Sequence, residues 1–147
     1  MEYRILGRTG LRVSAVALGC EGFIHKTPEE VCADFDFAIG HGVNFIDIYS
    51  PNPELRTNIG AALEGRGDFI IQGHLCTTWE NGQYLRTRDP EKTLASFDLQ
   101  LQQLRTDCLD IGMIHYVDAE ADFHRVFGGE IIRIAQRLRG EGRIRHI

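Results

Sequence analysis

Short apolar runs alternate with longer amphipathic stretches along the chain. Four runs have the length and the polar boundaries of strands that are buried on both faces: residues 15–18, 43–46, 69–71 and 109–114. After each run, apolar residues recur every three or four positions, which is the period of an α-helix. The order strand then helix, repeated four times, predicts a parallel α/β sheet joined by right-handed crossovers.

Local signals mark the beginnings of three helices. Thr27, Asn52 and Asp89 can each cap a helix, and a proline follows each of them at the first helical position. Glu30 completes a capping box with Thr27. Gly65 and Gly67 are expected to close the second helix. The predicted inward-facing residues are Val31, Phe35, Ala38 and Ile39, then Leu55, Ile59, Ala62 and Leu63, then Leu94, Phe97, Leu101 and Leu104, and finally Ile131, Ile132, Ala135 and Leu138.

Three further segments complete the predicted fold. Residues 1–14 alternate around a turn at Gly7 to Gly10, which predicts an N-terminal hairpin that acts as a lid or plug. Residues 77–88, which include Trp79, are expected to form a long loop on the side of the polar strand ends. Residues 143–147 predict a fifth strand that is just beginning.

Polar side chains stand where the predicted strands end. Asp47 and His115 follow two strands, His74 ends another, and Tyr49 lies just after Asp47. Ligands bind at the carboxyl ends of parallel strands, so we predict a site formed by these four residues. In the plainer interpretation, Asp47 accepts loop hydrogen bonds, the histidines are half-buried structural residues and Tyr49 packs under the loop. Zinc binding by Asp47, His74 and His115 is a weaker alternative, and the favoured hypothesis includes no metal.

Chain length and the missing phosphate motif bear on the choice of fold. No GxGxxG follows the first strand, as a dinucleotide-binding open sheet would require. A complete (β/α)8 TIM barrel takes ~250 residues. We therefore expect residues 1–147 to form one partial barrel domain, comprising the hairpin, four β-α units and the start of a fifth strand. Open sheet edges recruit partners, which predicts a homo-oligomer or a piece of a longer protein.

Composition excludes several kinds of partner. A net charge of -5 and a pI near 5.6 argue against nucleic acid as a partner. The arginines near the end of the sequence fit the solvated face of a helix and the loop after it: Arg133, Arg137, Arg139, Arg143 and Arg145. No apolar run approaches the ~20 residues that cross a bilayer. The four cysteines show no CxxC pair and no signal peptide precedes them, so the expected location is the cytoplasm.

Four segments together resemble the aldo-keto reductase family: residues 3–14, 42–47, 58–63 and 110–118. They are similar to the opening hairpin of the family, the strand with its catalytic aspartate, the following helix and the strand with its catalytic histidine. The resemblance implies NADPH-linked reduction of a small carbonyl compound to an alcohol. In the family a tyrosine is the general acid, a lysine lowers its pKa, an aspartate pairs with the lysine and a histidine orients the carbonyl.

Asp47 and His115 match the family pattern, whereas two other positions depart from it. Asn52 stands where the family has its tyrosine, and Gly73 where it has its lysine. Tyr49, His74 or His115 would then have to act as the acid. Because the family holds NADP(H) mainly by loops after later strands, the chain alone is expected to bind it poorly and to be weakly active or inactive. A non-catalytic half-barrel that serves binding or assembly is the alternative.

Overall fold

Five parallel strands form the central sheet of the computed structural model, which describes residues 1–66 and 69–147. The strands are β3 (Leu18–Gly19), β4 (Phe45–Ile48), β5 (Ile70–Leu75), β8 (Leu109–Ile114) and β9 (Ile144–His146). They neighbour one another in this same order, and each pairing is parallel. A doubly wound sheet reverses its order at a switch point, whereas sequential order is that of a (β/α) barrel.

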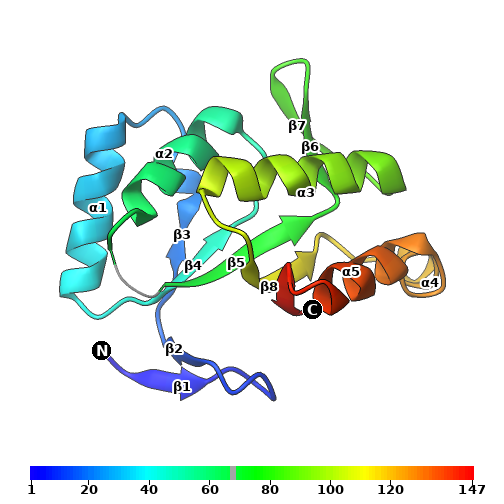
Figure 1. Cartoon of the computed structure of the whole chain (residues 1–147), viewed down its shortest axis with the longest axis horizontal. Coiled ribbons are helices and arrows are strands. Elements are labelled where there is room, and N and C mark those ends of the chain that lie inside the picture. The colour runs from blue at the N-terminus through cyan, green and yellow to red at the C-terminus, as the bar shows by residue number, and fades with distance from the viewer. Residues whose placement is uncertain (67–68) are drawn as a thin grey trace.

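The helices follow one another along the outside of this sheet (Figure 1). They are η1 (Cys20–Phe23, a 3₁₀ turn), α1 (Pro28–Gly40), α2 (Pro53–Leu63), α3 (Pro90–Leu104), α4 (Glu120–Phe127) and α5 (Glu130–Gly140). Helix α1 packs on α2, α2 on α3, and α3 contacts α5. Consecutive crossovers therefore turn the same way, and the chain forms the first part of a barrel, as predicted.

The three predicted helix starts are confirmed. The Thr27 side chain accepts a hydrogen bond from the Glu30 amide, and the Glu30 carboxylate accepts one from the Thr27 amide. Asn52 and Asp89 cap α2 and α3 through their side-chain oxygens. Of the glycines expected to close α2, Gly65 follows the helix with a φ of 74°, while Gly67 lies outside the described residues.

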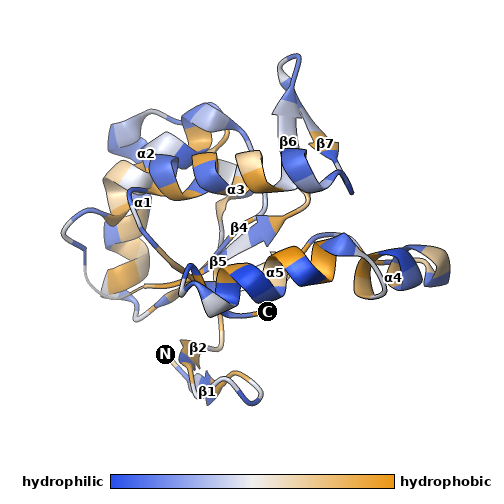
Figure 2. Ribbon diagram, turned by 45° about the vertical axis from the view of Figure 1, so that its right-hand side comes forward, coloured by the Kyte–Doolittle hydropathy of each residue, from blue (hydrophilic) through white to orange (hydrophobic). Residues whose placement is uncertain are grey.

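The core lies between the helices and the sheet, and most of the predicted inward-facing residues belong to it. Two do not. Ile39 is 37% exposed in the last turn of α1. In α5, where apolar and polar segments alternate (Figure 2), Ile134 is buried and Ile132 is only half-buried. Ile134 lies one turn after Ile131 and so shares its face.

Two strands reach further towards the predicted site than their apolar runs suggested. Strand β4 ends at Ile48, so Asp47 lies inside the strand rather than after it, and β5 ends at Leu75, one residue beyond the predicted end at His74. Polar side chains are tolerated there because they are hydrogen-bonded to one another. The apolar run locates each strand but does not fix its ends: β8 matches residues 109–114 at both ends, whereas β3 and β4 begin later than the runs at 15–18 and 43–46.

Residues 77–88 do not form the predicted long loop. They form a hairpin of β6 (Thr77–Glu80) and β7 (Gln83–Arg86). Asn81 and Gly82 have positive φ values of 53° and 78°. Asn-Gly is the preferred pair for a tight hairpin turn because both residues tolerate positive φ, so the signal was present in the sequence.

The predicted N-terminal hairpin is confirmed as β1 (Tyr3–Ile5) and β2 (Arg12–Ser14). It lies at the amino ends of the sheet strands (Figure 1). The Tyr3 hydroxyl donates to the Gly42 carbonyl over 2.9 Å, and the Asn44 side chain accepts from the Ser14 amide over 2.7 Å. The hairpin is therefore fixed at the end of the barrel opposite the predicted site.

Strands β3 and β9 lie at the two edges of the described sheet. Association through these edges stays a prediction. No helix within residues 1–66 and 69–147 is both long enough and apolar enough to cross a membrane.

Candidate functional site

Four side chains form a continuous hydrogen-bonded row at the carboxyl ends of the strands. Asp47 Oδ1 lies 2.9 Å from His74 Nε2. His74 Nδ1 lies 2.7 Å from His115 Nδ1, and His115 Nε2 lies 2.8 Å from the Tyr84 hydroxyl oxygen. We call Asp47, His74, His115 and Tyr84 the polar row. The sequence predicted the first three of these residues and missed Tyr84.

The sheet itself positions three members of the polar row. Asp47 of β4 lies opposite Gln72 of β5, and Gln72 Nε2 donates to Asp47 Oδ1 over 2.6 Å. His74 lies two residues after Gln72 and so points to the same face of the strand. His115 follows β8 directly, and its amide donates to the Leu75 carbonyl over 3.2 Å. Parallel pairing therefore brings the three side chains together.

Tyr84 reaches the polar row because the β6–β7 hairpin is tied to the segment that carries His115. Arg88, just after β7, donates to the carbonyls of His115 and Tyr116 over 2.9 and 3.0 Å. The same guanidinium forms an ion pair with Asp122 at 2.5 Å. These bonds hold the hairpin against the end of β8 and fix the position of Tyr84.

A hollow of about 310 Å³ lies beside the polar row, and Tyr49 and Tyr116 complete its lining. The Tyr49 ring lies nearly parallel to the His115 ring, at 6° with centroids 5.6 Å apart. It meets the Tyr84 ring edge-on at 6.0 Å. Trp79 instead lines a separate pocket between α2 and α3. The plainer interpretation placed Tyr49 under the segment 77–88; its ring does meet Tyr84 of that segment, and it also stacks on His115.

Burial and neighbouring groups set the protonation of the polar row. Burial, followed by the charges of His74, Arg88 and Arg86, lowers the pKa of His115 to about 4. Burial alone would raise the pKa of Asp47, but hydrogen bonds from His74 and Gln72 outweigh it and hold that pKa below its usual value. Near neutral pH, Asp47 is therefore ionised and His115 is neutral.

The pKa values of both nearby tyrosines are raised. Burial is the main cause for Tyr84. For Tyr49, burial and then Glu21 raise the pKa to about 12. Both hydroxyls therefore keep their protons near neutral pH.

In the form in which each imidazole carries a single ring proton, the hydrogen bonds of the polar row have one direction. The ionised Asp47 can only accept, so His74 donates from Nε2 and accepts at Nδ1. His115 must then donate from Nδ1 and accept at Nε2, where the Tyr84 hydroxyl is the donor. Each group donates to the next one, from Tyr84 inward to Asp47.

The polar row does not have the arrangement of a metal centre. His74 uses both ring nitrogens to bond its two neighbours, so Asp47, His74 and His115 form a line and do not surround a common point. Across residues 1–66 and 69–147, no group of three or more His, Cys, Asp or Glu side chains could hold a metal ion. The zinc alternative therefore has no ligand set in the described chain.

The two departures from the family pattern both lie outside the polar row. Asn52 caps α2. A Cβ added at Gly73 would lie 2.5 Å from Leu109 Cδ1 and 2.7 Å from Gln100 Nε2. A side chain at position 73 would therefore point into the packing beneath α3 and away from Asp47. In this chain the group that pairs with Asp47 is the next residue, His74.

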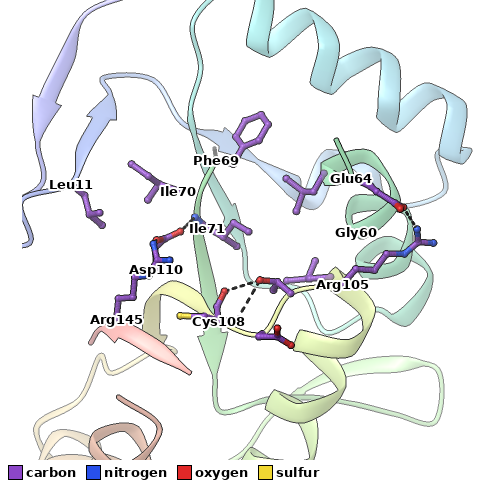
Figure 3. Close-up of a pocket in the computed structure, with 14 residues that line it drawn as sticks. Leu11, Gly60, Glu64, Phe69, Ile70, Ile71, Arg105, Cys108, Asp110 and Arg145 are labelled. Carbon is purple, nitrogen blue, oxygen red and sulfur yellow. Dashed lines mark hydrogen bonds and ion pairs between the residues drawn. The ribbon is translucent and has the colours of Figure 1, made fainter. Parts of the chain in front are cut away.

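A second and larger hollow, of about 630 Å³, lies near the amino ends of the strands (Figure 3). Asp110 accepts from the Ile71 amide over 2.9 Å and forms an ion pair with Arg145 at 2.5 Å. Arg105 pairs with Glu64. These charged groups are bonded to one another and lie at the end of a barrel that contributes stability rather than chemistry.

Comparisons with known proteins agree with the resemblance to the aldo-keto reductase family. A sequence model of the Aldo/keto reductase family matches residues 16–147. L-galactose dehydrogenase from Arabidopsis thaliana is 29% identical over 157 aligned residues, which cover 100% of this chain and 47% of that protein.

Two solved structures have a similar fold. A protein of Pseudomonas aeruginosa described as an aldo-keto reductase matches with a TM-score of 0.84 and 26% identity, over 97% of this chain and 56% of that one. The aldo-keto reductase AKR11C1 from Bacillus halodurans, in its holo form, matches with a TM-score of 0.81 and 23% identity, over 99% of this chain and 49% of that one. The chain spans about half the length of the relatives it matches.

Proposed function

As the chain belongs to the aldo/keto reductase family, we propose that it takes part in the NADP(H)-linked interconversion of a small carbonyl compound and an alcohol. The main support is the convergence of Asp47, His74 and His115 beside a hollow at the carboxyl ends of the strands. Reduction of a carbonyl needs a positioned group that protonates the developing alkoxide, which is worth about 10²–10⁴-fold in rate. The hollow offers that position to the oxygen of a substrate.

The residues around the hollow suit the nicotinamide end of the cofactor. NADP(H) supplies or accepts the hydride in such a reaction. The rings of Tyr49, Tyr84 and Tyr116 give the hollow flat walls, and Asp47 is the one carboxylate among the described residues that line it. Because the chain spans about half of its relatives, we expect it to bind the whole cofactor weakly by itself.

The cytoplasm is the location that we propose for the protein. Cys20, Cys32, Cys76 and Cys108 are free thiols in the structure, and free thiols are usual in a reducing compartment. The alternative of a non-catalytic binding or assembly module draws on the open strands β3 and β9 and on Asn52 and Gly73, which stand where the family has its tyrosine and lysine. Membership of a reductase family does not favour it.

Product analysis in both directions tests the proposal. The purified chain is incubated with NADPH and a panel of aldehydes and ketones, and with NADP⁺ and the matching alcohols, and products are identified by mass spectrometry. The same assays are run on a chimera that joins this chain to the second half of the Pseudomonas aeruginosa protein. We expect slow conversion by the chain and faster conversion by the chimera.

The matched control is His41→Gln in both proteins, since His41 lies on the surface after α1, where its ring nitrogen Nδ1 is bonded to the Phe37 carbonyl. It should leave conversion unchanged. Circular dichroism and thermal unfolding show whether each protein is folded. A folded chain and a folded chimera that convert no member of either panel would contradict the proposed function, as would conversion by the chain that survives loss of both Asp47 and His115.

A further inference from the structure

Tyr84 occupies the outer end of the polar row. Its side chain is 37% exposed and lines the hollow, whereas His74 and His115 are 7% and 9% exposed. At the other end, the Asp47 side chain is 33% exposed. The row therefore has two accessible ends and a buried middle, which is the arrangement required to pass a proton between a bound substrate and solvent.

We propose that Tyr84 is the general acid and base of the reaction and that it exchanges its proton with Asp47 through His115 and His74. This inference rests on the proposed function. It assigns the acid to a hairpin residue that lies far in the sequence from Asn52, the position that the family pattern indicates. It also gives His74 and His115 the role of carrying a proton rather than delivering it to the substrate.

Tyr84 fits this role better than Tyr49, which lines the same hollow. The Tyr84 hydroxyl is bonded to His115 at 2.8 Å. Tyr49 contributes its ring to a stack on His115, and within the described residues no hydrogen bond joins its hydroxyl to the polar row. Loss of the Tyr84 proton can be compensated along the polar row, whereas Tyr49 has no such connection to Asp47 among the described residues.

The direction of the bonds gives a balanced step for oxidation of an alcohol. The substrate hydroxyl gives its proton to the Tyr84 oxygen as Tyr84 gives its own proton to His115 Nε2. His115 passes its Nδ1 proton to His74 Nδ1, and His74 passes its Nε2 proton to Asp47. The C–H bond of the alcohol breaks and its hydride goes to NADP⁺, so the substrate loses one proton and one hydride and becomes a carbonyl. Reduction follows the same path in reverse.

Burial and the neighbouring guanidinium groups keep a proton from resting on His115. Arg86 and Arg88 approach it from the hairpin side, and His74 and Asp47 approach it from the sheet, while Tyr49 and Tyr116 cover it with uncharged rings. The two guanidinium groups oppose the positive charge that the imidazole would carry if it were protonated. A proton that reaches His115 is therefore passed on to His74 and Asp47.

Nitrogen NMR of the histidine side chains tests the polar row without cofactor or turnover. In the 147-residue chain above neutral pH, we expect the Nδ1–H tautomer for His115 and the Nε2–H tautomer for His74. Tyr84→Phe should shift the His115 Nε2 resonance because that nitrogen loses its donor. The matched variant Tyr49→Phe removes a hydroxyl from the same hollow and should leave this nitrogen nearly unchanged.

The opposite tautomer of His115, or equal shifts in both variants, would overturn the proposed path. Turnover then tests the role of Tyr84 itself. In the chain and the chimera, Tyr84→Phe should lower kcat by about 10²–10⁴-fold with little change in KM, and the basic limb of the pH profile should move. Retained kcat in a folded Tyr84→Phe variant would refute that role. If the unsubstituted chain and chimera show no turnover but the expected tautomers of His74 and His115 are observed, the proposed function fails and the hydrogen-bonded row stands.

Discussion

The two ends of the sheet hold polar groups of different kinds. At the carboxyl end, Asp47, His74, His115 and Tyr84 are joined in a single direction and border a hollow of about 310 Å³ lined by tyrosines. At the amino end a hollow of about 630 Å³ is bordered by ion pairs that satisfy one another, such as Asp110 with Arg145 (Figure 3).

The difference shows that size alone does not identify a functional site. Around the larger hollow, Asp110 is paired with Arg145 and Glu64 with Arg105, and Asp110 also accepts from the Ile71 amide. The smaller one has groups that can change their protonation and lie at accessible ends of a buried path. Substitutions at the two ends should therefore have different consequences, on activity at one end and on stability at the other.

The largest expected effect is at Asp47. Asp47→Asn removes the final proton acceptor of the polar row, and we expect conversion to fall by about 10²–10⁴-fold. Asp110→Asn is the matched control at the amino end, because it keeps an acceptor for the Ile71 amide. Initial rates of the two variants in the chimera measure the difference. Equal losses in both would show that the two ends do not differ in function.

The stability of the chain should depend on pH through His115. Its pKa is about 4 in the folded chain, against an ordinary value of 6.5. The unfolded chain therefore binds the extra proton first as the pH falls, so the free energy of unfolding should decrease from about pH 6.5 towards pH 4 by no more than about 3 kcal/mol.

His115→Gln should remove most of that decrease in urea unfolding measured across this range. Asp47 does not contribute in the same window, because its lowered pKa places its loss of stabilisation below the ordinary value of 3.8. An unchanged slope in His115→Gln would mean that the imidazole is not held neutral by its surroundings.

Gly73 tests whether position 73 belongs to the carboxyl-end site. Gly73→Ala places a methyl group against Leu109 and Gln100, and we expect a loss of about 1–3 kcal/mol in unfolding free energy from overpacking. The tautomers of His74 and His115 should stay the same. A change in those tautomers with no loss of stability would place the residue in the polar row instead.

The smallest expected effect is at the amino end. Arg145 pairs with Asp110, but its side chain is 63% exposed, and exposed ion pairs contribute about 0–1 kcal/mol. Arg145→Ala should therefore change the unfolding free energy by less than about 1 kcal/mol and leave conversion unchanged. Differential scanning calorimetry and the product assay check both parts.

The fold was predictable from the sequence because its signals are local. Capping residues such as Thr27 and Asn52 marked helix starts correctly, and apolar runs located the strands of the sheet. The end of β4 was placed too early because the polar Asp47 interrupts the apolar pattern while remaining in the strand, and the end of β5 was placed at His74, one residue before the observed end. A polar residue near the end of a strand breaks the apolar pattern, so the pattern stops before the strand does.

Of the polar row, only the residues carried by the central sheet or directly after one of its strands were predictable from the sequence. Asp47, His74 and His115 could be inferred from strand order, since parallel strands bring their carboxyl ends together. Tyr84 depends on the β6–β7 hairpin and on the contacts of Arg88 with the end of β8. The Asn81-Gly82 pair indicates the turn. The packing of the hairpin against the end of β8 is a tertiary contact, and no local sequence pattern encodes it.

The most direct test of the account is to map where NADPH contacts the chain by NMR. At concentrations high enough to offset weak binding, the account predicts shift changes at His74, Tyr84 and His115, and none at Asp110 and Arg145. Changes confined to Asp110 and Arg145, with the polar row unaffected, would contradict it.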